Sequence, residues 1–113
     1  MFLEPKIKSE IRVKALIKQC DIEMIPVVLL HRGDIDAGAV LLKINLMDGQ
    51  CILLSQTRDI SGKLVWMRTL GEGHFMESKV DEYIKHQLNI DQDLWVLEIE
   101  DRKGLYTPTE PVI

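Results

Sequence analysis

The stretch HRGDIDAGAVLLKINL, residues 31–46, decides most of what the fold can be, because a polar loop leads directly into a regular apolar segment. Residues 39–46 alternate in the way a β-strand requires, and one face of that strand carries only apolar side chains: Val40, Leu42, Ile44 and Leu46. The loop before it, residues 32–38, holds the densest group of charged side chains, with glycines that can permit positive φ. The stretch therefore predicts a central core strand and a first candidate site.

The composition is that of one soluble globular domain. The chain has 113 residues, of which 46% are apolar and 28% charged, so it can form a core without a metal or a disulfide. The net charge of −4 argues against nucleic acid or an anionic membrane as partner. Acidic residues interrupt the one basic cluster, which therefore indicates a solvated face: Lys6, Lys8, Arg12, Lys14 and Lys18.

Two features point to the cytoplasm. The chain starts with neither the basic residues nor the apolar run of a signal peptide, and no apolar run is long enough to span a bilayer. Cys20 and Cys51 have no metal-binding or redox spacing, and both lie in apolar segments. We therefore expect two reduced, buried thiols in a cytoplasmic protein.

The remaining pattern predicts a helix, four strands, a second helix and a fifth strand. Helical spacing favours a helix over residues 9–20 with Ser9 as N-cap, although the alternation over residues 6–13 leaves an extended start open. The second helix covers residues 78–89 with Ser78 as N-cap. The strands cover residues 27–31, 39–46, 50–56, 64–70 and 94–100.

Short turns between the first four strands predict an antiparallel meander. We therefore expect an α+β fold: an antiparallel sheet of about five strands with both helices packed on the face of Val40, Leu42 and Ile44. Residues 1–104 form a single domain, and residues 105–113, which contain two prolines, form a mobile tail.

The polar loop is one candidate site, formed by His31, Arg32, Asp34 and Asp36. Four polar or charged groups within six residues could bind a metal or a polar ligand, but the EF-hand pattern fails because Ala39 and Asn45 occupy the positions of its glycine and glutamate. Aspartates in such loops more often accept backbone N–H groups. The side chains would need to converge on a pocket to form a site.

The sequence contains no motif for catalysis, and no metal or cofactor is expected. The three histidines lack metal-binding spacing, neither cysteine has a basic neighbour, and there is no nucleophile elbow or phosphate-binding loop. The sequence thus gives no positive indication of an enzyme.

The outer faces of the last two strands form the other candidate site. Alternation directs Trp66 and Arg68 outwards from one strand, and Val96, Glu98 and Glu100 outwards from the next. Tryptophan and arginine are enriched at interface hot spots. The alternative is an ordinary ion pair of Arg68 with one of the glutamates.

Several blocks of the sequence resemble an alphaproteobacterial domain-of-unknown-function family, catalogued under number 1491. These blocks are residues 8–11, the loop and strand of residues 32–45, and residues 93–102. The resemblance extends over nearly the whole chain up to about Gly104 and implies a single-domain bacterial cytoplasmic protein. It implies no activity and no catalytic residue.

The sequence therefore favours a non-enzymatic binding module whose partner is another protein or a second copy, joined through a strand edge or the Trp66 face. The alternative is a small enzyme or metal-binding protein that uses the loop from His31 to Asp36.

Overall fold

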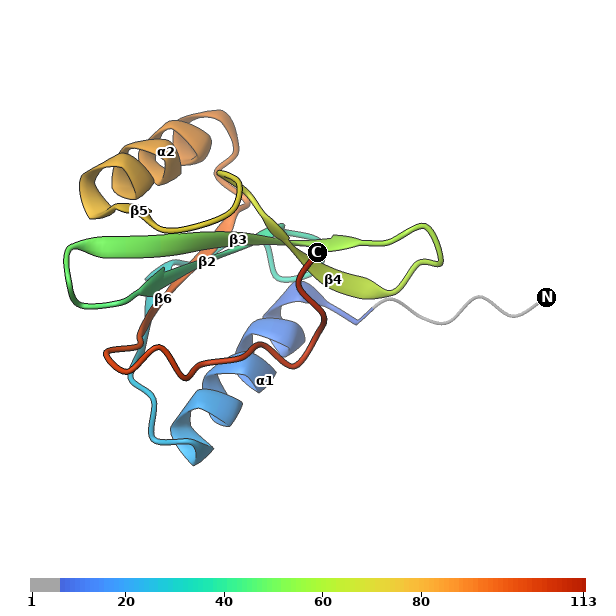
Figure 1. Ribbon diagram of the computed structural model, residues 1–113. Coiled ribbons are helices and arrows are strands. Elements are labelled where there is room, and N and C mark those ends of the chain that lie inside the picture. Colours follow the sequence, from blue (N-terminus) through green and yellow to red (C-terminus); the bar gives the residue numbers. More distant parts are fainter. Residues whose placement is uncertain (1–6) are drawn as a thin grey trace.

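The computed structural model describes residues 7–113 and consists of one sheet with a helix on each face (Figure 1). The helices are α1 (Ser9–Ile22) and α2 (Glu77–Ile90). The strands lie in the order β1-β6-β2-β3-β4, and β5 pairs with β3. Their bounds are β1 (Val27–His31), β2 (Val40–Asn45), β3 (Gln50–Arg58), β4 (Leu64–Arg68), β5 (Phe75–Met76) and β6 (Trp95–Glu100). Neither helix in this part of the chain has the length and apolar character needed to cross a bilayer.

The α+β class is confirmed, but the predicted antiparallel meander is wrong at its first strand. β1 pairs with β6 rather than with β2, and β6 pairs in parallel with β2. Only β2, β3 and β4 follow one another as antiparallel neighbours. β2 and β6 carry the most continuously buried side chains of all the strands. Pairing them places the two most buried strands in the interior of the sheet, where both faces are covered.

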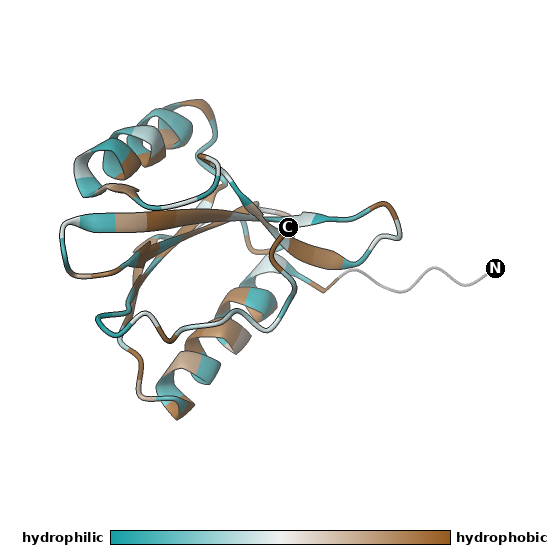
Figure 2. Cartoon of the chain, viewed as in Figure 1, coloured by the Kyte–Doolittle hydropathy of each residue, from teal (hydrophilic) through white to brown (hydrophobic). Residues whose placement is uncertain are grey.

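The prediction that both helices cover one face is also wrong. Val13 and Cys20 of α1 pack in one core cluster with Leu42 and Leu97. On the opposite face α2 packs in a second cluster, which contains Val80, Ile84, Leu41, Leu53 and Val96. β2 thus presents apolar side chains to both sides and needs a cover on each. Figure 2 shows the apolar strands lying between the two helices.

Both helices begin on backbone carbonyls of neighbouring loops. The amides of Ser9 and Glu10 donate to the carbonyls of Asp36 and Ile35, at 3.2 and 3.0 Å. The amide of Glu77 donates to the carbonyl of Gly49 at 3.0 Å. The helical alternative for residues 9–13 is confirmed, while residue 6 lies outside the described residues.

The two predicted N-caps are wrong. The N-cap residues are Lys8 and Met76, and neither makes a side-chain capping bond. Ser9 and Ser78 are the first and second residues of their helices. Tertiary contacts with loops supply acceptors for helix-start amides that a capping side chain would otherwise satisfy.

The C-terminal segment runs alongside β4. The amide of Trp66 donates to the carbonyl of Pro111, and the amide of Ile113 donates to the carbonyl of Trp66, both at 2.8 Å. The carboxylate of Asp101 accepts the amides of Leu105 and Tyr106 at 3.0 Å, which fixes the turn into this segment. The path of residues 105–113 is therefore defined by backbone hydrogen bonds, and their mobility in solution stays a prediction.

Candidate functional site

The four polar residues of the loop do not converge on one point. His31 contacts the carbonyl of Leu94 through Nδ1 at 2.7 Å, and Arg32 pairs with Glu10 at 2.5 Å. The carboxylate of Asp34 accepts the backbone amides of Asp36 and Ala37, at 3.1 and 2.9 Å. Asp36 itself faces Lys8 at 3.4 Å. Each side chain thus has its own structural partner, as expected of a turn rather than a pocket.

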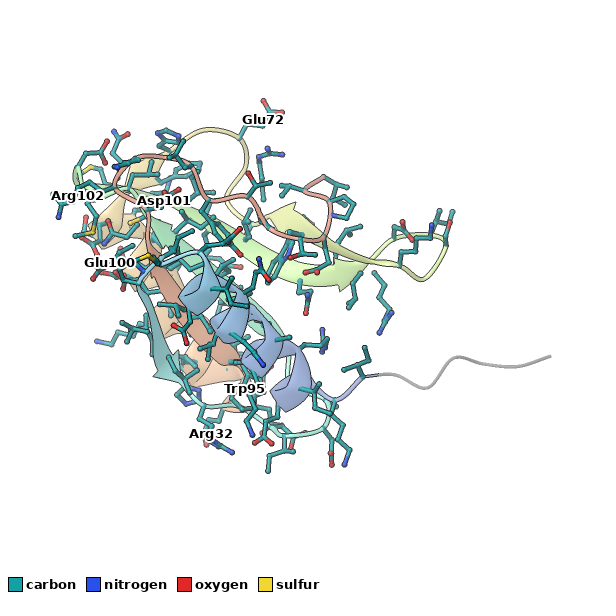
Figure 3. The ribbon with its side chains drawn as sticks, turned by 90° about the horizontal axis from the view of Figure 1, so that it is seen from below. Arg32, Glu72, Trp95, Glu100, Asp101 and Arg102 are labelled. Carbon is teal, nitrogen blue, oxygen red and sulfur yellow. The ribbon has the colours of Figure 1, made fainter. Side chains whose placement is uncertain are left out.

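The loop wraps around Trp95. The indole Nε1 donates to the carbonyl of Asp34 at 2.7 Å, and the guanidinium of Arg32 lies 5.5 Å from the ring centroid. Figure 3 shows Arg32 and Trp95 together at one end of β6. A Cβ on Gly33 or Gly38 would lie 2.1 Å from the carbonyl oxygen of Asp93 and within 3 Å of the Trp95 ring. Both glycines are therefore needed for close packing against the start of β6.

The predicted Trp66 face is not an exposed surface. Trp66 is buried in the α1-side core, and its Nε1 donates to Glu110 at 3.1 Å. Arg68 is exposed two residues further on and reaches the carbonyl of Ile113 at 3.5 Å. Val96 is fully buried in the α2-side core, on the other face of the sheet. The outward orientation predicted for Trp66 and Val96 is wrong because each face carries a helix.

The predicted glutamates lie apart from Arg68. β4 and β6 are separated by β2 and β3, so a cross-strand ion pair of Arg68 with Glu98 or Glu100 cannot form. Glu100 is exposed at the far end of β6, beside Asp101 and Arg102 (Figure 3). The five residues predicted as one interface are therefore distributed over two faces and two separated strands.

Glu98 belongs to a charged cluster that the sequence did not reveal. The ammonium of Lys43 lies 2.7 Å from Glu77, 2.6 Å from Asp81 and 3.3 Å from Glu98, and its side chain is only 3% exposed. Asn45 joins the cluster by donating to Glu77 at 3.1 Å and to Glu98 at 3.0 Å. The three carboxylates come from α2 and β6, so only the tertiary fold brings them to Lys43.

The cluster holds the lysine in its charged form. Burial alone would lower the pKa of Lys43, but the hydrogen bonds to Asp81 and Glu77 and the charge of Glu98 raise it above its ordinary value. A lysine acting as base or nucleophile needs a lowered pKa. The arrangement is that of a structural tie between the sheet and α2. Among residues 7–113 no group of three His, Cys, Asp or Glu side chains could hold a metal.

Neither thiol has the accessibility and the lowered pKa of a nucleophilic cysteine. Burial raises the pKa of Cys20 to about 11, with smaller effects from the charges of Glu23 and Asp21. Burial likewise raises the pKa of Cys51 to about 11. Both cysteines are free and buried, whereas a nucleophilic cysteine is accessible and has a lowered pKa.

The outer edge of β1 is an exposed apolar surface. This strand contains no charged residue along VVLL, and three consecutive apolar side chains are 48%, 38% and 48% exposed: Val28, Leu29 and Leu30. Ile22 and Met24, just before the strand, are 67% and 89% exposed. Such an apolar edge is rare in a monomer, because natural edge strands are usually protected by charges, prolines, β-bulges or a covering element; here a bulge between Leu29 and His31 limits the regular edge to residues 27–29.

The backbone of β1 is available along that edge. The amide of Glu100 donates to the carbonyl of Pro26 at 3.0 Å, which places the pair 26/100 in hydrogen-bonding register. In an antiparallel ladder the backbone N–H and C=O groups of successive residues point alternately to the two sides of a strand. Those of Val28 therefore point towards β6, and those of Val27 and Leu29 point away from the sheet. No residue of the described range 7–113 pairs with this outer edge.

The opposite edge of the sheet differs. Residues 111–113 pair with the middle of β4 through an isolated parallel bridge between Trp66 and Val112. The apolar run 27–30 was visible in the sequence, but its place at an edge depends on the insertion of β6 between β1 and β2. The missing charges in the run are the signal that could have marked it as unprotected.

Comparisons with known proteins agree with this fold. Residues 7–107 match the family model described as "Protein of unknown function (DUF1491)". A crystal structure of a DUF1491 family protein from Caulobacter crescentus CB15 is similar, with 34% identity and a TM-score of 0.83 over 96% of this chain and 100% of that one. An NMR structure of a DUF1491 family protein from the same organism gives 34% identity and a TM-score of 0.79 over 97% and 99%.

A more distant structure shows the same fold. The solution structure of protein Atu0922 from A. tumefaciens has 22% identity and a TM-score of 0.71, over 85% of this chain and 86% of that one. No curated protein matches significantly. The matches to the family model and to the Caulobacter structures cover almost the whole described chain. This chain therefore belongs to the DUF1491 family of proteins of unknown function.

Proposed function

We propose that this protein is a non-enzymatic interaction module that pairs with a second copy of itself through β1. The observation that carries the proposal is the apolar outer edge of that strand, where Val28, Leu29 and Leu30 are between 38% and 48% exposed. Backbone groups of Val27 and Leu29 are directed outwards and could continue the sheet.

A second copy is the partner that suits this edge best. Two VVLL segments in antiparallel pairing bring no like charges together, and a two-fold axis would place the same patch on both sides. Ile22 and Met24 lie just before the strand and could extend the apolar contact beyond a single pair of strands. That extension matters because a stable interface buries about 800 Å² per partner.

Analytical ultracentrifugation of the full chain tests the proposal. We expect a concentration-dependent species of about 26 kDa, twice the 13.0 kDa of one chain. Val28→Lys adds a charge to the exposed edge, and Leu29→Pro removes an outward N–H without removing a bond to β6. Both variants should sediment as monomers.

Met67→Lys is the matched control, because Met67 is also an apolar side chain on an edge strand and is 45% exposed on β4. This variant should dimerise like the wild type. A wild-type chain that stays at 13.0 kDa throughout the concentration range would disprove self-pairing. Equal dimerisation of Val28→Lys and wild type would place the interface elsewhere.

We also propose that the protein works in the cytoplasm of an alphaproteobacterium. Support comes from the relatives in Caulobacter crescentus and A. tumefaciens, and from two cysteines that are free and buried. Free thiols are typical of reducing compartments. Cell fractionation with an antibody against the chain would test the location, and recovery from the periplasm would contradict it.

A further inference from the structure

A hollow of about 240 Å³ lies between the start of α1, the loop before β2, and the β3–β4 hairpin. It is independent of the β1 edge. Its lining includes Arg12, Arg58, Gln56 and Asp36. A second hollow of about 300 Å³ shares Arg12, Gln56 and Leu64 with it and is bordered by the C-terminal segment. Two arginines therefore line one small cavity.

Arg12 is a half-buried cation that forms no salt bridge within residues 7–113, although the charge of Glu110 acts on it. Its guanidinium donates to the side-chain oxygen of Gln56 and, at 3.0 Å, to the hydroxyl of Ser9. Its Nε is buried and has no hydrogen-bond partner within the described structure. Because Nε is buried, an anion would bind through the remaining N–H groups of the two terminal nitrogens, each of which uses only one hydrogen in its contact with Gln56 or Ser9.

Arg58 adds a second positive charge to the same hollow. It donates to the carbonyl of Gly62 at 2.8 Å, and no acidic side chain in the described part of the chain pairs with it. Burial, and then the charge of Arg58, lower the pKa of Arg12, while Glu110 acts in the opposite direction. Two guanidinium groups repel each other here, and an anion between them would relieve that repulsion.

We propose that this hollow binds a small molecule through a carboxylate or phosphate group held between Arg12 and Arg58. Arginine suits both groups because its planar fork donates two parallel hydrogen bonds. A volume of about 240 Å³ accommodates the anionic group and a few further atoms, rather than a large ligand.

Two nearby features do not compete for this role. The first amides of α1 are already used, because Ser9 and Glu10 donate to the carbonyls of Asp36 and Ile35. The carboxylate of Asp36 borders the hollow but faces Lys8 at 3.4 Å. The arginine side chains therefore carry the recognition, and the end of the helix does not.

NMR titration of the ¹⁵N-labelled full chain with inorganic phosphate and, separately, with acetate tests the site. Ionic strength is held constant with sodium chloride, because exposed charge interactions are screened by salt. We expect saturable shifts for the backbone amides of residues 56–58 and 12. Saturation by phosphate alone would identify a phosphate site, and saturation by acetate alone a carboxylate site.

Arg58→Gln provides the decisive variant, because Arg58 is exposed and its removal leaves the contacts of Arg12 intact. It should weaken anion binding by about fivefold or more, the effect of losing one charge-assisted contact. Arg102→Gln, at an exposed arginine outside the hollow, should bind like the wild type. The proposal is overturned if neither anion gives saturable shifts, or if Arg58→Gln binds as tightly as Arg102→Gln.

Discussion

Lys43 ties α2 to the sheet through its ion pairs with Glu77 and Asp81. Replacing it with Met keeps most of the side-chain volume but leaves Glu77, Asp81 and Glu98 close together without their cation. We expect Lys43→Met to lower the free energy of unfolding by about 1–3 kcal/mol, because three carboxylates then lie together without a cation, although water can reach those of Glu77 and Asp81. Urea denaturation followed by circular dichroism measures the loss.

Lys85→Met is the matched control for that experiment. Lys85 is exposed on α2 and forms no salt bridge with the described residues, so its replacement should change the free energy of unfolding by less than about 0.5 kcal/mol. A Lys43→Met protein as stable as this control would show that the three carboxylates gain nothing from the lysine.

In the loop before β2, the sequence predicts the contacts within the loop but not its contacts with distant residues. The glycines of the loop were assigned to positive φ, but neither Gly33 nor Gly38 adopts it; both are needed because Trp95 and the carbonyl of Asp93 lie against them. Asp34 does accept the loop amides, as turn chemistry predicts. Local chemistry was therefore predictable, whereas contacts with β6, about sixty positions along the chain, were not.

At the scale of one element, Ser9 fixes the start of α1 by a route other than capping. Its side chain is fully buried, and its hydroxyl donates to the carbonyl of Gly38 at 2.6 Å and accepts from Arg12 at 3.0 Å. Ser9→Ala leaves that carbonyl and the guanidinium without this partner. We expect a loss of about 1–2 kcal/mol in the free energy of unfolding.

Ser78→Ala gives the comparison within the same protein. Ser78 is exposed inside the first turn of α2 and makes no capping bond, so alanine should leave stability unchanged or raise it by a few tenths of a kcal/mol. If Ser78→Ala lowers stability as much as Ser9→Ala, measured by thermal unfolding, then Ser78 contributes to the start of α2 and the expected difference between the two serines is wrong.

Most elements were predictable from periodicity because each pattern is local. The helix beginning at Ser9 and the strand Val27–His31 agree with their predicted starts, and alternation located β2, β3, β4 and β6 within a few residues. β5 was missed because two residues are too short for a pattern. The edge role of β1 could not be predicted, because it depends on β6, which follows β1 by more than sixty residues.

At the scale of the whole molecule, the predicted strand order and the predicted placement of both helices on one face are wrong for one physical reason. Alternation in β2 was interpreted as one apolar and one open face, but Leu41 packs against α2 while Leu42 packs against the α1-side core. β2 therefore lies inside the sheet and is covered on both faces. The candidate interface around Trp66 followed from the same one-sided interpretation and was placed on faces that the helices cover.

The stability of the whole molecule should fall in alkaline solution. In the folded chain, burial raises the pKa of Cys20 and of Cys51 to about 11, compared with 9.0 for an unperturbed thiol. Between these values the unfolded chain releases protons that the folded chain retains, which favours unfolding. The raised pKa of Lys43 acts in the same direction above 10.5, its ordinary value.

We expect the free energy of unfolding to decrease by about 1 kcal/mol per cysteine between about pH 8 and pH 10. Urea denaturation in the presence of a reducing agent, repeated across this range, measures the slope. In the double variant Cys20→Ala/Cys51→Ala the chain is less stable throughout, but its slope over this range should be much smaller. If the double variant keeps the same slope, groups other than the two thiols cause the loss of stability in alkaline solution. If the stability of the wild type stays constant across this range, the thiols ionise as easily in the folded chain as in the unfolded chain.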